Sequence, residues 1–467
     1  MACFLLNKSN ITITIPKVEE IDKVSFYEIF VKVGTVSWKV KHRYSDFVNL
    51  NDKLVIDHCV NKDILPPKKI IGKRDPVFVE KRRVGLENYL MSVITFLRET
   101  MPRTLAEFLD FHKYDILFLL QDMSSSFLRD GDSILLQSKR YQFNPLQLHA
   151  ISERLKQPCP PAEMFDKCYD FSHVLDVCCQ LETAEVEGSW DPVGTSDIIP
   201  NNCAFELSVL KDLKELTLTR VAVRKLYHTG TLRQTLRRLV VSQCRLQSAA
   251  DVLLCDAVHK ECGLENPPED RIWQKLEEVD LSQNNIKQFD NTLLLMPNVK
   301  QLTANENQIT QVDNFTQLSG LTHLYLSGNS ISNTDDLHLC LSNIVHLDLS
   351  QNMITSLAGF SRLSSLQGLD LGSNIIPQVS EVQHIQGLAQ LDYLVLTGNP
   401  VSTVVDYRIK VLEHFGRRAA CICLDNEKPS QKELDTVAVM LALKVVKEGK
   451  TPVFSRTIEP TYPNSPQ

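Results

Sequence analysis

The sequence of 467 residues lacks the features that mark membrane-spanning, secreted and catalytic chains. Its apolar runs are too short for a transmembrane helix, and the start MACFLLNKSN has neither the basic flank nor the apolar stretch of a secretory signal. None of the 13 cysteines forms a CxxC pair, which favours reduced cytosolic thiols over a disulfide framework. No phosphate-binding glycine loop, nucleophile elbow or metal motif is present, so we expect neither an enzyme nor a cofactor nor a metal.

The charge is unevenly distributed along the chain. The net charge is −7, yet residues 1–115 hold 19 Lys and Arg against 15 Asp and Glu, which gives +4 there and −11 for the remainder. Residues 39–83 alone hold 12 basic and 6 acidic side chains. A basic head on an acidic body predicts an anionic partner for the head only and argues against nucleic acid along the whole chain.

The first part of the chain has the pattern of a small α+β domain. Three segments alternate in polarity or are rich in aromatic and β-branched side chains, as strands are: residues 11–15, 26–33 and 37–41. The apolar period then becomes helical over residues 47–54 and 86–97. We therefore predict a three-stranded sheet with helices over residues 9–120.

Residues 121–205 are the least regular part of the sequence. A helix is expected over residues 145–155, whereas QPCPP at residues 157–161 breaks the chain, and residues 190–202 have the composition of an irregular loop. We interpret this part as a connecting, partly helical region that caps the next domain of the chain.

From about residue 206 the sequence is periodic. The pattern Leu-x-x-Leu-x-Leu-x-x-Asn recurs, with apolar replacements, and its asparagines are Asn284, Asn307, Asn329, Asn352, Asn374 and Asn399. Their spacing of 22 to 25 residues is typical of leucine-rich repeats. The leucines form a short strand and turn that point into a shared core, and the asparagine amides are expected to bond backbone groups from one coil to the next. These residues predict an α/β solenoid over residues 206–425.

Both ends of this array differ from its regular part. Two degenerate repeats precede it with Val221 and Cys244 at the asparagine position, where we expect the turn bonding to be weaker or absent, and an insertion at about 249–272 follows them. Near residue 425 the chain resembles the cap that covers the open core of such arrays. Residues 426–467 are expected to form a terminal helix and a disordered tail.

Three short segments of the N-terminal domain combine basic and aromatic residues: RYSDF at 43–47, PPKK at 66–69 and KRR at 81–83. A guanidinium fork suits a phosphate, and an aromatic face suits the ring of a phosphorylated sugar. A solvated basic surface, with Tyr44 as a plain core aromatic, is the alternative. In this order the segments resemble the phosphoinositide-binding phox-homology (PX) family, over residues 9–120.

The PX resemblance implies a role for each of four residues. Arg43 would bind the 3-phosphate of phosphatidylinositol 3-phosphate, and Tyr44 would pack beneath the inositol ring. Lys68 would meet the 1-phosphate, and Arg82 would bond the ring hydroxyls. These four residues are our candidate phosphoinositide site, and the resemblance makes the 3-phosphorylated lipid the favoured ligand.

Four neighbouring residues are secondary candidates for contact with lipid or membrane. Lys69 and Arg83 are the alternatives if the alignment slips by one residue, and otherwise add attraction to an anionic membrane. Ile70 and Ile71 lie in the same lysine-flanked loop and either insert into the bilayer or pack on their own domain.

The variable positions of the repeat strands are expected to face the concave surface of the solenoid. Those that suit protein binding are His323, Tyr325, His346, Asp348 and Tyr393. Aromatic side chains often anchor such contacts, although an ordinary solvated face is the alternative. His346 and Asp348 share one strand with no apparent nucleophile, so catalysis is not expected.

The combination of modules resembles the nischarin family of imidazoline-receptor-like proteins, in a short form without the long C-terminal region of vertebrate members. Five segments carry this resemblance: residues 40–47, 65–73, 193–198, 406–412 and 432–437. It implies a cytoplasmic adaptor, peripheral on early or recycling endosomes, with integrin tails or the Rac/PAK pathway as partners in cell migration. The alternatives are a cytosolic regulatory subunit that binds a phosphatase or kinase through the repeats, and an enzyme of unrecognised type.

Overall fold

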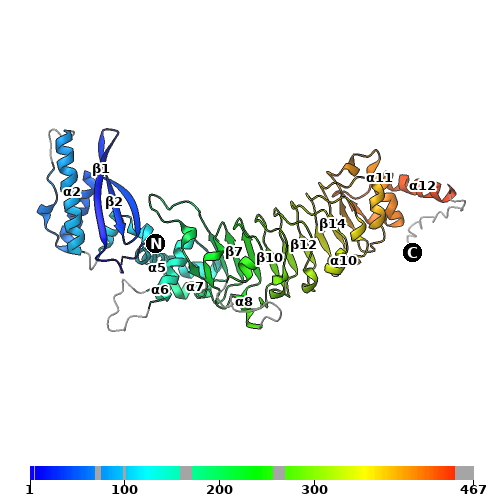
Figure 1. The fold of residues 1–467 in the computed structure, drawn as a ribbon, viewed down its shortest axis with the longest axis horizontal. Helices are drawn as coiled ribbons and strands as arrows, with labels where there is room; N and C mark the ends of the chain where they lie inside the picture. Colours follow the sequence, from blue (N-terminus) through cyan, green and yellow to red (C-terminus); the bar gives the residue numbers. More distant parts are fainter. Residues whose placement is uncertain (5, 69–74, 98–100, 158–170, 256–268, 448–467) are drawn as a thin grey trace, which may run out of the picture. The chain divides into compact units, whose positions relative to one another are not determined.

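The computed structural model describes residues 1–467 apart from 5, 69–74, 98–100, 158–170, 256–268 and 448–467. The chain divides into two compact units, residues 1–284 with 294–297 and residues 285–293 with 298–467. An antiparallel sheet with helices opens the first unit, and coils with parallel strands follow (Figure 1). No helix in the described part of the chain is long and apolar enough to cross a membrane.

The N-terminal sheet is an antiparallel meander of β1 (Ile11–Ile21), β2 (Val24–Val33) and β3 (Val36–Arg43), in the order β1-β2-β3. The turn between β1 and β2 places Asp22 and Lys23 at φ values of 49° and 64°. This left-handed backbone matches the twist of a two-residue hairpin. The predicted three-stranded sheet is confirmed.

Helices pack beside this sheet and complete the N-terminal domain. They are α1 (Tyr44–His58), α2 (Pro76–Leu97), α3 (Arg103–Phe108), α4 (Phe111–Tyr114) and α5 (Ile116–Gln137). The predicted apolar faces are buried, as Phe47 of α1 and Leu86 of α2 show. Trp38 of β3 lies in the same core, where its indole Nε1 donates to the Leu109 carbonyl at 2.7 Å. Helix α5 continues past the predicted boundary at residue 120.

Residues 121–205 do more than connect, because they contribute strands to the parallel sheet. β4 (Arg140–Phe143) pairs with β5 (Thr183–Glu187), and β5 pairs with β7 (Glu215–Thr219), all in parallel. Between β4 and β5 lie α6 (Pro145–Leu155), at the predicted residues, and α7 (Ser172–Gln180). The coils thus begin near residue 140 rather than 206.

The remaining elements of the first unit continue these coils. β9 (Arg238–Ser242) pairs in parallel with β7 and with β10 (Glu278–Asp280). A separate two-stranded sheet joins β6 (Phe205–Glu206) and β8 (Leu226–His228). Two short helices also occur: α8 (Leu232–Thr235) and α9 (Ala250–Leu253). Most of the predicted insertion at about 249–272 lies outside the described residues.

The second unit repeats the same coil, as the successive short strands in Figure 1 show. Its parallel strands are β11 (Gln301–Thr303), β12 (His323–Tyr325), β13 (His346–Asp348), β14 (Gly368–Asp370), β15 (Tyr393–Val395) and β16 (Cys423–Leu424). Its helices are α10 (Leu337–Cys340), α11 (Tyr407–Phe415) and α12 (Gln431–Lys447). Helix α12 confirms the predicted terminal helix, and the predicted disordered tail lies outside the described residues.

Asparagine amides link neighbouring coils, as predicted. Asn352 is 7% exposed, and its Nδ2 donates to the carbonyls of Leu326 at 2.9 Å and Leu349 at 3.1 Å. Its Oδ1 accepts from the Ile331 N–H at 2.9 Å. Leu326 and Ile331 belong to the preceding coil, so one side chain satisfies buried backbone groups on two coils.

At Cys244 the degenerate repeat keeps turn bonding, in the weaker of the two predicted forms. The Cys244 thiol accepts from the Val221 N–H at 3.3 Å and lies 3.5 Å from the Leu218 carbonyl, which it can serve as a donor. Sulfur therefore takes the place of an amide in the ladder, because a thiol can both donate and accept, although weakly. Burial raises the pKa of Cys244 to about 11, so it remains a thiol.

The predicted C-terminal cap closes the array. The Asp425 carboxylate accepts from the Leu396 N–H at 2.8 Å and from the Tyr407 hydroxyl at 2.9 Å. Arg408 ties the cap to α12 through an ion pair with Glu433 at 2.8 Å. The Asp425 carboxylate of the cap thus accepts from a backbone N–H of the last coil. In the regular coils, the next repeat supplies such acceptors.

Within the first unit, the irregular loop predicted at 190–202 joins the antiparallel domain to the coils. The Asp197 carboxylate accepts from the Ser37 N–H at 3.1 Å, and Thr195 Oγ1 accepts from the Lys39 N–H at 3.1 Å, so this loop covers the open edge of β3. At the other end Asn201 Nδ2 donates to the Arg220 carbonyl at 2.8 Å.

Candidate functional site: a basic–aromatic cluster and a strand face

Arg43 stands at the N-cap of α1, where β3 ends and the helix begins. Its side chain is 58% exposed, and its Nε lies 3.2 Å from Asp46 Oδ1. Asp46 also accepts from the Arg43 N–H at 3.0 Å. Burial raises the pKa of Asp46, but the hydrogen bonds from Arg43 outweigh this, so the pKa is lowered and the carboxylate is charged. The guanidinium is thereby oriented while most of it remains open to solvent.

Tyr44 connects α1 to the proline–lysine loop. Its hydroxyl donates to the Pro66 carbonyl at 2.5 Å, and burial raises its pKa, which keeps the phenol protonated for this bond. Pro66 in turn packs on α2 at Gly85, where an added Cβ would lie 2.7 Å from Pro66 Cγ. Glycine at position 85 therefore lets the loop approach the helix closely.

Arg82 lies directly against Tyr44. Its guanidinium carbon is 4.2 Å from the Tyr44 ring centroid and 4.4 Å from that of Phe78, one turn earlier on α2. The side chain is 9% exposed, and its Nε has no hydrogen-bond partner among the described residues. The geometry is that of a cation–π sandwich with a donor left over.

Arg83 points to the other side of α2. It forms an ion pair with Glu80 at 2.7 Å and donates to the Ile15 carbonyl of β1 at 2.5 Å, with Glu87 at 3.4 Å. Its donors are thus committed to binding α2 to the sheet. Arg83 was the alternative to Arg82 if the alignment to the PX motif slips by one residue. The structure places Arg82, not Arg83, at the Tyr44 ring.

The other predicted lipid residues lie in the proline–lysine loop. Lys68 is exposed and lies two residues after Pro66. The hydrogen bond from Tyr44 to the Pro66 carbonyl therefore keeps Lys68 near the cluster. Lys69, Ile70 and Ile71 lie outside the described residues.

Asp46 and Phe78 were not predicted as parts of this cluster. Asp46 has a readable signal, because an acidic residue three positions after an N-cap commonly bonds back to it. Phe78 has one as well, because it lies four residues before Arg82 on the same helix, where side chains meet. The contact of Arg82 with Tyr44 instead depends on how α2 is rotated against α1.

The repeat strands bring the predicted protein-binding residues into two parallel rows. His323 is opposite His346 in register, and Tyr325 is opposite Asp348. The imidazoles are stacked with centroids 4.9 Å apart, and burial, together with the neighbouring His346, lowers the pKa of His323. Tyr393 belongs to the row of His323 and His346, two strands beyond His346. Its hydroxyl donates to Asn426 at 2.7 Å.

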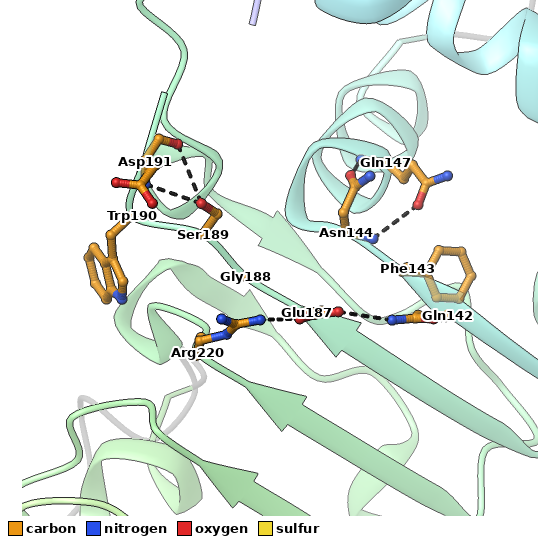
Figure 2. A pocket seen from close by; sticks show the side chains of 10 residues that line it. All are labelled: Gln142, Phe143, Asn144, Gln147, Glu187, Gly188, Ser189, Trp190, Asp191 and Arg220. Carbon is orange, nitrogen blue, oxygen red and sulfur yellow. Dashed lines mark hydrogen bonds and ion pairs between the residues drawn. The ribbon is translucent and has the colours of Figure 1, made fainter. Parts of the chain in front are cut away.

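A cavity of about 530 Å³ lies at the ends of β4, β5 and β7, and Figure 2 shows its lining. Glu187 accepts from Arg220 and from Gln142, the latter at 3.1 Å. Asn144 and Gln147 bond each other at 2.9 and 3.0 Å as the capping box of α6. The polar side chains of this cavity largely satisfy one another, so we assign it no ligand.

Two family models match the chain. Residues 31–112, within the domain predicted at 9–120, match the PX domain, and residues 274–331 and 342–401 match the leucine rich repeat. The protein therefore consists of an N-terminal PX domain with a three-stranded antiparallel sheet, and a C-terminal leucine-rich-repeat region, as predicted. PX domains bind phosphoinositide membranes, and leucine-rich repeats bind proteins.

Similar proteins share one module each. The PX domain-containing protein kinase-like protein of Rattus norvegicus is 40% identical over 78 residues, 17% of this chain and 13% of that protein. Sorting nexin-1 of Homo sapiens is 36% identical over 84 residues, 15% of this chain and 16% of that protein. A leucine-rich-repeat protein of Leptospira interrogans aligns over 52% of this chain and 55% of its own, with 21% identity and a TM-score of 0.35. The chain thus spans 13% and 16% of the length of the two curated relatives.

Proposed function

We propose that this protein is a phosphoinositide-directed adaptor, in which the PX domain binds phosphatidylinositol 3-phosphate and the repeats bind a protein partner. The observation that supports the lipid site best is the position of Arg82 against Tyr44, next to the exposed Arg43. In this proposal Arg43 binds the 3-phosphate, Tyr44 carries the inositol ring, Lys68 meets the 1-phosphate and Arg82 donates to ring hydroxyls. A phosphate would compete with Asp46 for the Arg43 guanidinium.

Co-sedimentation of the full chain with vesicles tests this site. Vesicles that contain phosphatidylinositol 3-phosphate should bind more tightly than vesicles with unphosphorylated phosphatidylinositol or the 4-phosphate. Arg43→Ala should weaken binding at least tenfold, because a charge-assisted bidentate contact is lost. Lys53→Ala, which removes a positive charge from an exposed position about 15 Å further along α1, is the matched control. Equal binding by wild type and Arg43→Ala would reject the lipid site.

We further propose early or recycling endosomes as the site of action, since this lipid chemistry gives a membrane address. Endosomal localisation of the fluorescently tagged full chain should be lost in Arg43→Ala and kept in Lys53→Ala. A diffuse wild-type signal would favour the cytosolic regulatory subunit instead. We also propose action by binding rather than catalysis, because the two matched modules, the PX domain and the leucine rich repeat, are binding modules.

The resemblance to nischarins supports a more specific proposal for the repeats. Integrin cytoplasmic tails or members of the Rac/PAK pathway would be the partners, in signalling that controls cell migration. Immobilised integrin tail peptides should retain the full chain, and Tyr325→Ala should reduce retention because it removes an aromatic anchor from the strand face. Retention equal to that on a scrambled peptide would reject this partner.

A further inference from the structure

Charges on the strand face of the first unit pair with one another. Four acidic side chains there lie against basic ones: Glu182 with Lys139 and Lys214, Glu185 with Arg140, Glu187 with Arg220, and Glu278 with Arg238. Two flanking lysines lower the pKa of Glu182 to about 2, and Figure 2 shows Glu187 between Arg220 and Gln142. The charges of these four carboxylates are therefore compensated by neighbouring basic side chains.

The strand face of the second unit differs. Asp348 and Asp370 lie opposite each other in register on β13 and β14, and neither forms an ion pair within the described part of the chain. One oxygen of each carboxylate accepts from a backbone N–H two residues on, Ser350 at 2.8 Å and Gly372 at 2.9 Å. Burial, together with the charges of Asp348 and Asp425, raises the pKa of Asp370. Two like charges on adjacent strands destabilise each other unless a cation joins them.

Aromatic rings lie near this carboxylate pair, and contacts hold those of His346 and Tyr393 in place. A Cβ at Gly368 would overlap the His346 imidazole, so the absent side chain makes room for a ring that also stacks on His323. Tyr325 lies beside Asp348 in register, and the Tyr393 hydroxyl is bonded to Asn426. Ordered rings contribute contact area at little entropic cost on binding.

We propose that this surface binds a basic segment of a partner protein, with an arginine side chain at Asp348 and Asp370. We define it as the aromatic–carboxylate face, made of His323, Tyr325, His346, Asp348, Asp370 and Tyr393. The inference rests on the proposed protein-binding function of the repeats and adds the chemistry of the partner.

Arginine fits this face better than other cations. A planar guanidinium donates to carboxylates in a fork and stacks on aromatic rings, and both kinds of group are present here. A metal ion is less suited, because the described residues hold no group of three His, Cys, Asp or Glu placed to bind one.

Selection of a random dodecapeptide library, displayed on phage, on the immobilised full chain tests the proposal. The selected peptides should be rich in arginine and poor in aspartate and glutamate. In fluorescence anisotropy, Asp348→Asn/Asp370→Asn should bind the best peptide at least tenfold more weakly. Asparagine keeps the acceptor oxygen for the Ser350 and Gly372 N–H groups, so the strands should keep their fold.

The matched control is Glu185→Gln/Glu278→Gln, which removes the same charge from the paired face and should change binding less than twofold. Peptides that are acidic or neutral, or equal binding by the Asp348→Asn/Asp370→Asn variant, would overturn the proposal. Loss of such peptides on Tyr325→Ala or Tyr393→Ala would then show that the face binds protein of another chemistry. That result would leave the proposed function standing. Selection of no peptide above the background of uncoated support would overturn the inference.

Discussion

The Asp197 carboxylate accepts hydrogen bonds from both the backbone N–H and the hydroxyl of Ser37, 160 residues earlier in the chain. Asp197 also donates its own N–H to the Ser37 carbonyl at 3.1 Å. Thr195 adds a bond to the Lys39 N–H at 3.1 Å. The loop therefore occupies the edge of β3 as a short extra strand would, and protects backbone groups that an edge strand otherwise exposes.

Asp197→Ala should release this loop from β3. The Ser37 and Lys39 amides should then exchange hydrogen faster, by about tenfold or more, because each relies on the loop for an acceptor. Asp191→Ala, an exposed change in the same loop, is the control. Hydrogen exchange with mass spectrometry measures the effect, and unchanged rates in Asp197→Ala would show that the loop is held by other contacts.

Arg82 and Arg83 should respond differently to the same conservative change. Arg82→Lys keeps the charge but loses the planar stack on Tyr44 and Phe78, so binding to vesicles with phosphatidylinositol 3-phosphate should weaken several-fold. Arg83→Lys loses donors to Glu80 and Ile15, so it should lower the melting temperature while vesicle binding stays within twofold. Equal vesicle binding by wild type and Arg82→Lys would place the headgroup elsewhere.

The sequence was most informative where one side chain repeats a local role. The asparagines at 22- to 25-residue spacing predicted the coils and their bonding, because each one satisfies backbone groups in a turn of fixed shape. β4 and β5 were missed since Ala184 and Ser189 replace the leucine and asparagine of that pattern, while the parallel pairing needs only an alternating strand. At Cys244 the sequence left open whether the turn bonding is weaker or absent, because that bonding depends on a neighbouring coil that the residue type alone does not reveal.

In the candidate lipid site too, residues of a contiguous motif could be predicted, whereas contacts between separate elements could not. Arg43 and Tyr44 were predictable because their motif is contiguous. Which of Arg82 and Arg83 lies at Tyr44 depends on the rotation of α2 about its axis. In the structure this rotation turns Arg83 towards Ile15 of β1. Asp370 was expected on the strand face but was not among the predicted protein-binding residues, since its significance arises from register with Asp348 on the neighbouring strand.

Asn352→Ala should destabilise the repeats strongly. The change removes three amide bonds to carbonyls and leaves the buried Ile331 N–H without its acceptor. Unsatisfied buried groups cost about 1–3 kcal/mol each, so a loss of roughly 2–4 kcal/mol in the free energy of unfolding is expected.

Cys244→Ala serves as the comparison, because weaker thiol bonds are lost there and the effect should be about half as large. Urea unfolding followed by circular dichroism measures both variants. A larger effect for Cys244→Ala would contradict the view that the thiol is a weak substitute for the amide.

Asp115 gives the N-terminal domain a dependence on pH. The carboxyl group is fully buried and accepts from the Phe4 N–H at 2.6 Å and the Leu117 N–H at 2.9 Å. Burial raises its pKa to about 7 in spite of these bonds. The folded state therefore holds a proton that the unfolded state, with an ordinary pKa near 3.8, releases.

The contribution of Asp115 to stability should be complete below pH 3.8, decline as the pH rises towards 7, and stay constant above 7. Three pKa units correspond to a change on the order of 4 kcal/mol in the free energy of unfolding. Asp115→Asn removes the titration and adds a cost that does not vary with pH, because its amide nitrogen cannot accept from Phe4 or Leu117. The stability of wild type relative to Asp115→Asn, measured by thermal unfolding between pH 4.5 and 8, should therefore fall with rising pH. A constant difference would show that Asp115 does not titrate in this range.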